Sequence, residues 1–237
     1  MLNKQLQLFV FPYAGGSIES FRSFSQLIDE RIDVVIIEYA GRGTRAKEPL
    51  ASSLDILLED AINYASERRD ISVPYAIFGY SMGSIFAYEV LRRQALQGKN
   101  LHTFICAEIS PKERAMEFSK VEKPSDEMIL NRARRLGGVD ERIVKNRRFF
   151  EIYMKPMISD YKLLYEYRFQ AIKDKIKTDI TFFYSEADTP LKSIQTWEDL
   201  IEGKFDFFEF GNNHFFINEY YGEMAKIVNT HLLSFLE

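Results

Sequence analysis

The sequence predicts an α/β fold in which a mainly parallel sheet is covered by helices on both faces. Short apolar, β-rich runs alternate with segments of helical spacing, no internal repeat is visible, and 46% of the 237 residues are hydrophobic. Strands that alternate with helices form parallel sheets with function at the carboxyl ends of the strands. A chain of this length holds one substantial core, so we expect a single domain over residues 1–237.

Each predicted element follows from its residue pattern. Runs rich in β-branched and aromatic residues predict strands at Leu6–Phe11, Val34–Glu38, Tyr75–Phe78, Phe104–Ala107, Ile180–Tyr184 and Phe205–Phe208. Apolar residues at helical spacing predict helices at Phe21–Ile28, Leu54–Arg68, Met82–Gln97, Ile194–Leu200 and Tyr220–Leu236.

One segment between the fourth and fifth strands breaks this alternation. For roughly seventy residues there is no convincing strand, too long a stretch for an ordinary connection. Helical spacing predicts three helices there, at Ser125–Leu136, Glu141–Tyr153 and Met157–Phe169. We therefore expect a helical lid over residues 112–177. It holds 17 Lys and Arg against 11 Asp and Glu, so part of its surface is basic: either a solvated helical face or a docking surface for an acidic partner.

Composition excludes several classes of protein. The 31 basic and 35 acidic side chains give a net charge of −4, which argues against a surface built to cover nucleic-acid phosphate. The single cysteine, Cys106, excludes an intrachain disulfide and a multi-cysteine metal site and fits the cytoplasm. The N-terminus shows no signal peptide, and the uncharged stretch from Ile71 to Tyr88 contains Pro74 and glycines, so a strand and a helix explain it better than a membrane span.

A Gly-x-Ser-x-Gly motif, Gly79-Tyr80-Ser81-Met82-Gly83, lies between the third predicted strand and the next helix. A sharp turn from strand to helix strains the serine backbone, and the glycines prevent collisions with the adjacent strand and helix. Ser81 then stands at a helix N-terminus, where the helix dipole and the Met82 N–H stabilise a developing oxyanion. We interpret Ser81 as a nucleophile; the alternative is an ordinary glycine-flanked turn with a serine N-cap.

A serine nucleophile needs a base, and the chain has three histidines. His102 precedes a strand and belongs at the amino edge of the sheet, and His231 lies within the last helix. His214 follows the final strand, so its loop leaves the edge from which Ser81 emerges. We predict His214 as the base.

The carboxylate that orients this histidine should come from the same edge of the sheet. Asp188 follows the strand Ile180–Tyr184, whereas Glu186 and Glu209 are weaker candidates nearby. The resulting order Ser81, Asp188, His214 is the chain order of the α/β-hydrolases.

The second oxyanion donor should come from the loop after the first strand. Its glycines, Gly15 and Gly16, allow backbone amides to approach a substrate closely. We predict the Ala14 N–H, with Tyr13 as the alternate. A phosphate cradle is the competing interpretation, but the loop lacks the spacing and lysine of a P-loop.

Linked motifs spread over the whole chain resemble a known family. They are Phe-Pro-Tyr-Ala-Gly-Gly at 11–16, Gly-Arg-Gly-Thr-Arg at 41–45, Gly79–Ser84, Arg-Leu-Gly-Gly at 135–138 and Asn-His-Phe-Phe at 213–216. In matching order and spacing, the sequence is similar to the type II thioesterases. These stand-alone α/β-hydrolases accompany nonribosomal peptide and polyketide synthases, and relatives terminate medium-chain fatty acid synthesis.

The resemblance implies hydrolysis of acyl groups held as thioesters on the phosphopantetheine arm of carrier domains, chiefly to clear misprimed or stalled units. The partners would be acyl or peptidyl carrier domains, with no nucleic acid and no membrane. The serine mechanism needs no metal and no organic cofactor.

Some positions depart from the family pattern. Tyr80 replaces the usual histidine before the nucleophile, and Ser159 stands where an arginine usually precedes Asp160; Ala40 and Asn212-Asn213 are further departures. Arg42 and Arg45 of the Gly-Arg-Gly motif are expected to hold a loop by ion pairs rather than to contact substrate.

Three alternative functions remain open from the sequence. One is a medium-chain acyl-carrier-protein hydrolase of the same fold. A small-molecule carboxylesterase or lipase would use the same three residues, and comparison of a thioester with a matched oxygen ester separates the two. A non-catalytic binding module on a hydrolase scaffold would fail to react with a fluorophosphonate serine probe.

Overall fold

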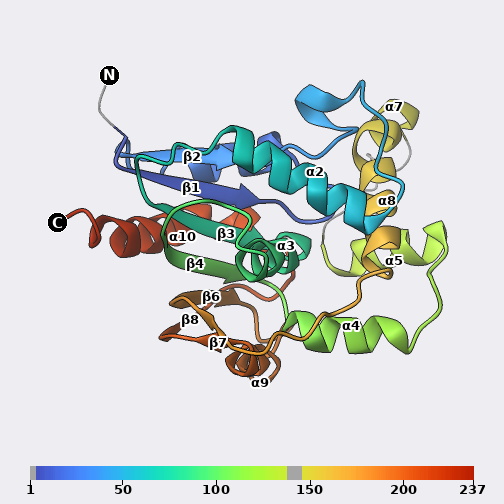
Figure 1. The fold of residues 1–237 in the computed structure, drawn as a ribbon. Helices are drawn as coiled ribbons and strands as arrows, with labels where there is room; N and C mark the ends of the chain where they lie inside the picture. Colours follow the sequence, from blue (N-terminus) through green and yellow to red (C-terminus); the bar gives the residue numbers. More distant parts are fainter. Residues whose placement is uncertain (1–3, 138–145) are drawn as a thin grey trace.

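The computed structural model describes residues 4–137 and 146–237. At its centre lies a sheet with the strand order β2-β1-β3-β4-β6-β8, in which each neighbouring pair is parallel (Figure 1). The strands are β1 Leu6–Phe11, β2 Ile32–Ile36, β3 Tyr75–Tyr80, β4 Asn100–Cys106, β6 Ile180–Tyr184 and β8 Phe205–Glu209. Each predicted strand is present, although β2 lies two residues earlier than the predicted Val34–Glu38 and β4 begins four residues before the predicted Phe104–Ala107.

Helices cover both faces of this sheet, which explains why every residue of β1 and β3 is buried. Phe9, Ile77 and Phe182 share one core with α2 (Leu54–Glu67), α3 (Met82–Arg92) and the short helices α9 (Leu191–Ile194) and η4 (Gln195–Asp199). Val10 and Phe78 face the other core, beneath α1 (Arg22–Ser25) and α10 (Ile217–Leu233). The predicted helix Phe21–Ile28 is instead two short turns, η1 (Ile18–Phe21) and α1.

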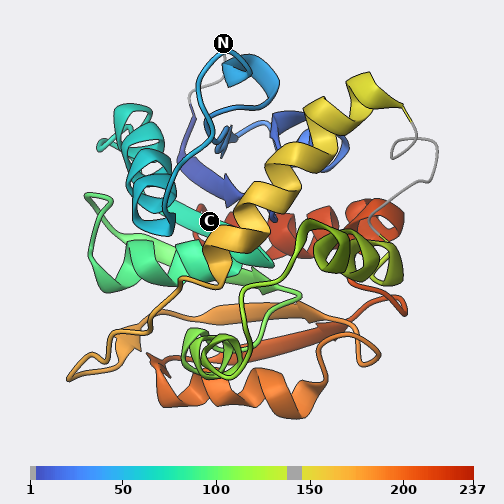
Figure 2. The same ribbon diagram turned by 90° about the vertical axis from the view of Figure 1, so that its right-hand side faces the viewer.

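Helices of the segment 112–177 lie beyond the carboxyl ends of the strands. They are α4 Pro111–Ser119, α5 Asp126–Arg135, α7 Arg147–Phe149, the π-helical turn η3 Phe150–Met154 and α8 Lys155–Leu164. Figure 2 looks onto the strand ends and shows α8 crossing over them. Ile129 and Ala133 of α5 pack against Met154, Met157 and Ile158, so these helices have an apolar cluster of their own.

Serine caps begin several helices. The hydroxyls of Ser53, Ser110 and Ser125 each accept an N–H from the first turn of α2, α4 and α5. The cap satisfies a backbone donor that has no partner inside the helix.

The structure corrects two predictions for the segment 112–177. A short strand, β5 (Ile176–Lys177), lies where no strand was predicted and pairs with β7 (Ile201–Glu202) in a separate two-stranded sheet. Helix α4 was not predicted. The predicted helix Glu141–Tyr153 falls partly outside the described residues, and its described part is helical from Arg147. Within residues 4–137 and 146–237, no helix is long and apolar enough to span a membrane.

Candidate active site

Ser81 occupies a strained turn between β3 and α3. Its φ of 51° and ψ of −115° lie outside the regions that L-residues favour. A Cβ on Gly79 would lie 2.6 Å from Ser84 Cα, and one on Gly83 would lie 1.9 Å from the Phe11 carbonyl oxygen. Glycine is therefore required on both sides of Ser81, as the sequence pattern predicts, and the end of β1 lies against the start of α3.

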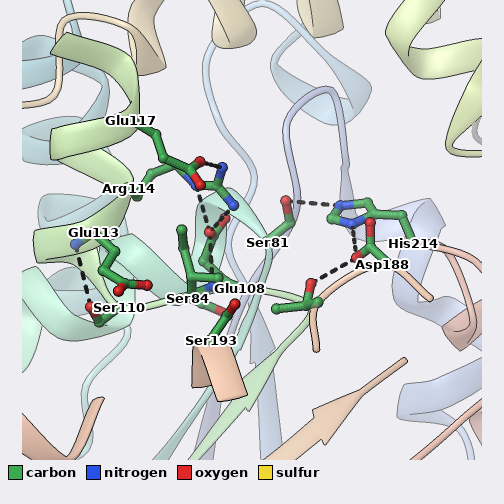
Figure 3. Close-up of polar contacts among 12 residues, drawn as sticks. Ser81, Ser84, Glu108, Ser110, Glu113, Arg114, Glu117, Asp188, Ser193 and His214 are labelled. Atoms are coloured by element: carbon green, nitrogen blue, oxygen red, sulfur yellow. Dashed lines mark hydrogen bonds and ion pairs between the residues drawn. The ribbon is translucent and has the colours of Figure 1, made fainter. Parts of the chain in front are cut away.

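The structure brings Ser81, His214 and Asp188 into hydrogen-bond contact (Figure 3). His214 Nε2 lies 3.0 Å from Ser81 Oγ, and His214 Nδ1 lies 2.7 Å from Asp188 Oδ2. Ser81 and His214 are 8% and 7% exposed, so little water competes for these contacts. In this arrangement His214 can take the proton of the Ser81 hydroxyl, while Asp188 orients the imidazole ring.

Asp188 is held as a carboxylate by its neighbours. Burial by itself raises the pKa of Asp188, but hydrogen bonds with His214 and Thr189, together with the charge of Arg114, outweigh it and lower that pKa overall. The Thr189 hydroxyl donates to Asp188 Oδ2 at 2.8 Å. The ionised form is the one that keeps the Nδ1 proton on His214 and leaves Nε2 free to accept.

The two alternative carboxylates lie elsewhere in the structure. Glu186 accepts the backbone N–H of Leu191 and so caps α9. Glu209 is the exposed last residue of β8. Neither makes a contact with His214 in the described part of the chain.

The loop that carries His214 is fastened by Tyr80. The Tyr80 hydroxyl donates a 2.6 Å hydrogen bond to the His214 backbone oxygen, and both groups are buried. Burial raises the pKa of Tyr80 well above its usual value, so the hydroxyl keeps the proton that it donates. A tyrosine at this position of the motif thus links the nucleophile turn directly to the histidine loop, a role that the sequence did not indicate.

Two backbone N–H groups are free to meet an oxyanion. Met82 is the first residue of α3, where no intrahelical acceptor exists. In the turn Tyr13–Gly16, the Gly16 N–H donates to Tyr13 O at 2.7 Å and the Gly15 N–H donates to Asp160, whereas the Ala14 N–H makes no hydrogen bond within the described residues. Ala14 is 6% exposed and belongs to the same apolar core as Met82.

The other titratable candidates lie away from Ser81. His102 is buried in β4 with Nε2 2.8 Å from Thr181 Oγ1, and His231 of α10 contacts Asp206. Cys106 is fully buried, and burial raises the pKa of its thiol. In the part of the chain that the structure describes, no group of three or more His, Cys, Asp or Glu side chains could hold a metal ion.

Both arginines of the Gly-Arg-Gly motif form ion pairs. Arg42 pairs with Asp160 of α8, and Arg45 pairs with Asp60 of α2 and with Glu48. These contacts connect the loop after β2 to two helices. Sequence reasoning anticipated ion pairs for both residues but not their partners.

A second buried ion pair lies on the other side of Ser81 from His214 in the view of Figure 3. Glu108, just after β4, accepts from Arg114 of α4 at 2.7 Å, and Arg114 also contacts Glu117. The side chains of Glu108 and Arg114 are 5% and 14% exposed. Helix α4 is therefore tied to the end of β4, beside the candidate nucleophile.

The family model of the thioesterase domain matches residues 6–232. The chain belongs to the thioesterase family. It is a hydrolase that acts on thioester bonds.

Individual relatives resemble it over most of its length. Thioesterase PikA5 of Streptomyces venezuelae is 26% identical over 98% of this chain and 82% of its own. The medium-chain S-acyl fatty acid synthase thioesterase of Rattus norvegicus is 26% identical over 89% of this chain and 81% of its own. Among solved structures, the RedJ thioesterase from the prodiginine biosynthetic pathway in Streptomyces coelicolor has a TM-score of 0.79 and 25% identity over 95% of this chain and 90% of its own. The structural match agrees with an α/β-hydrolase fold.

Proposed function

We propose that this thioesterase removes acyl groups from the phosphopantetheine arm of carrier domains and so clears misprimed or stalled units in nonribosomal peptide or polyketide synthesis. The proposal depends above all on the contact of His214 with both Ser81 Oγ, at 3.0 Å, and Asp188, at 2.7 Å. The relatives' names support the substrate class: one acts on the S-acyl groups of a synthase, and another belongs to a biosynthetic pathway.

The proposed mechanism uses these side chains, two amides and water. His214 Nε2 takes the Ser81 proton as the serine oxygen attacks the thioester carbonyl, and the N–H groups of Met82 and Ala14 hold the oxyanion. The carbon–sulfur bond breaks, and the pantetheine thiol leaves with the proton from His214. A water molecule, deprotonated by His214, then cleaves the acyl-serine, while Asp188 keeps the imidazole in one tautomer.

The segment 112–177 acts in this proposal as the lid of a single domain that spans residues 1–237. Its helices lie beyond the strand ends that carry the candidate site (Figure 2). Its excess of basic residues suits an acidic carrier domain. With one cysteine, which is buried, the chain suits a reducing compartment, and the proposal places the reaction in the cytoplasm.

Carrier domains loaded with different acyl groups test the proposal. The protein is incubated with each loaded carrier, and mass spectrometry follows the loss of the acyl group. We expect hydrolysis of aberrant acyl units from peptidyl or acyl carrier domains. Intact acyl carriers after incubation with a protein that hydrolyses small thioesters would count against the carrier substrate.

A second candidate function is release of medium-chain fatty acids from an acyl carrier protein. The similarity to the rat fatty acid synthase enzyme favours it. Carriers loaded with acyl chains of increasing length separate the two functions, because a medium-chain enzyme shows a maximum at one range of lengths. A matched oxygen ester identifies a general esterase if it reacts as fast as the thioester.

A further inference from the structure

A buried carboxylate fastens the loop that carries Ala14 to helix α8. The Gly15 N–H donates a 2.7 Å hydrogen bond to Asp160 Oδ2. The same carboxylate pairs with Arg42 through Nη1–Oδ2 at 2.5 Å and Nη2–Oδ1 at 2.8 Å. The side chains of Arg42 and Asp160 are only 3% and 2% exposed. A two-point contact with a planar guanidinium fixes the orientation of the carboxylate, and so of the hydrogen bond to Gly15.

Helix α8 also touches this loop through its backbone. A Cβ on Gly15 would lie 2.6 Å from Met157 Cβ and 2.9 Å from Met157 Cα. Met157 and Asp160 are three residues apart on α8 and therefore share one face of the helix. No side chain separates this face from Gly15, so a shift of α8 moves the loop with it.

The turn at Tyr13–Gly16 has the geometry of one of two related turn types, and Asp160 accepts a hydrogen bond from its central peptide. Gly15 has φ of +80° at the third position, which is the geometry of a type II turn. Type I and type II turns differ by a flip of the central peptide, here the one between Ala14 and Gly15. Asp160 accepts the N–H of this peptide; after a flip, the Ala14 carbonyl oxygen would face the carboxylate instead.

We propose that Asp160 is a positioning residue that couples helix α8 to the oxyanion hole. When α8 is docked, Asp160 and Met157 hold Gly15 in place, and this fixes the position of the turn that carries the Ala14 N–H. When α8 moves, that donor loses its alignment. The inference rests on the proposed role of Ala14. It makes the lid a determinant of the chemical step and not only of substrate entry.

The variant Asp160→Asn tests this coupling on a small acyl-pantetheine thioester. We expect kcat to fall about tenfold to a hundredfold, with KM within about twofold, since removal of one oxyanion donor costs about 10²–10³ in kcat. The affinity for a trifluoromethyl ketone, whose adduct with Ser81 carries the tetrahedral oxyanion, should fall by the same factor. The affinity for the product carboxylic acid should not change.

A second variant and a control complete the experiment. Asp160→Glu keeps a negative charge beside Arg42 and can replace the asparagine variant if that variant fails to fold. Its longer side chain displaces the carboxylate from Gly15. We therefore expect kcat and the affinity for the trifluoromethyl ketone to fall in this variant too. Asp60→Asn removes the charge that pairs with Arg45, and neither residue forms a hydrogen bond or ion pair with the turn Tyr13–Gly16 among the described residues. This control should keep the wild-type kcat and inhibitor affinity.

Two outcomes would overturn the inference. One is an Asp160 variant that folds and keeps kcat and inhibitor affinity while only its melting temperature falls, which would make Asp160 merely structural. The other is an equal loss in the Asp60→Asn control. A wild type that hydrolyses no thioester would instead contradict the proposed function, so the two failures are distinguishable.

Discussion

Among single residues, Ser81 combines a strained backbone with a hydrogen bond to His214 Nε2. We expect Ser81→Ala to lower thioester hydrolysis by about a millionfold, on the scale known for serine triads. Circular dichroism and a melting curve serve as the control for folding, because loss of one hydroxyl creates no cavity of consequence. Appreciable turnover by the pure variant would refute the nucleophile.

The carboxylate can be tested with matched variants of three neighbouring acids. Asp188→Asn should lower kcat by up to about 10⁴-fold, because the amide would stabilise the wrong tautomer of His214. Glu186→Gln and Glu209→Gln should change kcat little, since Glu186 caps α9 and Glu209 is exposed. A severe loss in Glu209→Gln with a mild loss in Asp188→Asn would move the acid to the other loop.

Tyr80 offers a test by removal of a single atom. Tyr80→Phe keeps the ring but leaves the buried His214 carbonyl without its 2.6 Å donor. An unsatisfied buried acceptor costs about 1–3 kcal/mol, so we expect lower stability in urea and a fall in kcat of up to about tenfold as the histidine loop loosens. Unchanged kcat together with unchanged stability would show that the hydrogen bond does not hold this loop.

Among the elements, α5 and α7 present basic side chains beyond the strand ends. Arg135, Arg147 and Arg148 are exposed. Arg132 is exposed as well, but its charge acts on Tyr161, so it is better left intact. If carrier domains dock here, reversal of charge at Arg135 or at Arg147 and Arg148 should raise KM for acyl-carrier substrates. Added salt should act in the same direction, because exposed charges are screened over about 10 Å at 0.1 M.

A small acyl-pantetheine thioester is the control for this experiment, because it never touches the docking surface. Its hydrolysis should stay nearly unchanged in the charge-reversed variants. Equal losses on both substrates would mean that these arginines support the structure of the lid. Insensitivity on both would place the docking surface elsewhere.

The elements that the sequence predicted well are those with a strong apolar pattern. The strands of the buried sheet and α2 are examples. A strand that is buried on both faces reads as a short apolar run, and a helix that is buried on one face shows apolar residues at helical spacing. Helix α4 was missed because Phe118 is its one buried apolar side chain besides Pro111, although Ser110 and Pro111 form a capping signal. The short strand β5 has two residues and depends on β7 for its existence.

In the candidate site, too, some residues could be placed from the sequence and others could not. Ser81, Asp188 and His214 could be placed because each follows a strand whose carboxyl end lies at one edge of the sheet. The contact of Asp160 with Gly15 joins positions 145 residues apart. It depends on where α8 lies over the strand ends, and no local pattern encodes that position.

For the whole molecule, the buried histidine of β4 predicts a pH dependence of stability. Burial, with a smaller effect of the nearby His231, lowers the pKa of His102 to about 4, from an ordinary value near 6.5. Between these pH values the unfolded chain binds a proton that the folded chain does not. The free energy of unfolding should therefore be unaffected above pH 6.5 and fall as the pH drops toward 4, by about 3 kcal/mol.

Urea titrations of the wild type and His102→Gln between pH 7.5 and about 4.5 measure this effect. The difference between the two free energies of unfolding should be constant above pH 6.5 and should shift in favour of the variant at lower pH. If the free energies of unfolding of the two proteins change in parallel over the whole pH range, groups other than His102 cause the loss of stability in acid.

The order in which the strands occur along the chain also determines when this enzyme can become active. Strands β1, β3 and β4, with the turn that presents Ser81, come from residues 6–106, whereas β6 and β8, whose loops carry Asp188 and His214, come after residue 180. During synthesis on the ribosome, the serine thus exists long before its base has emerged. Pairing of distant parallel strands is slow, so reactivity toward thioesters arises as one of the last events of folding.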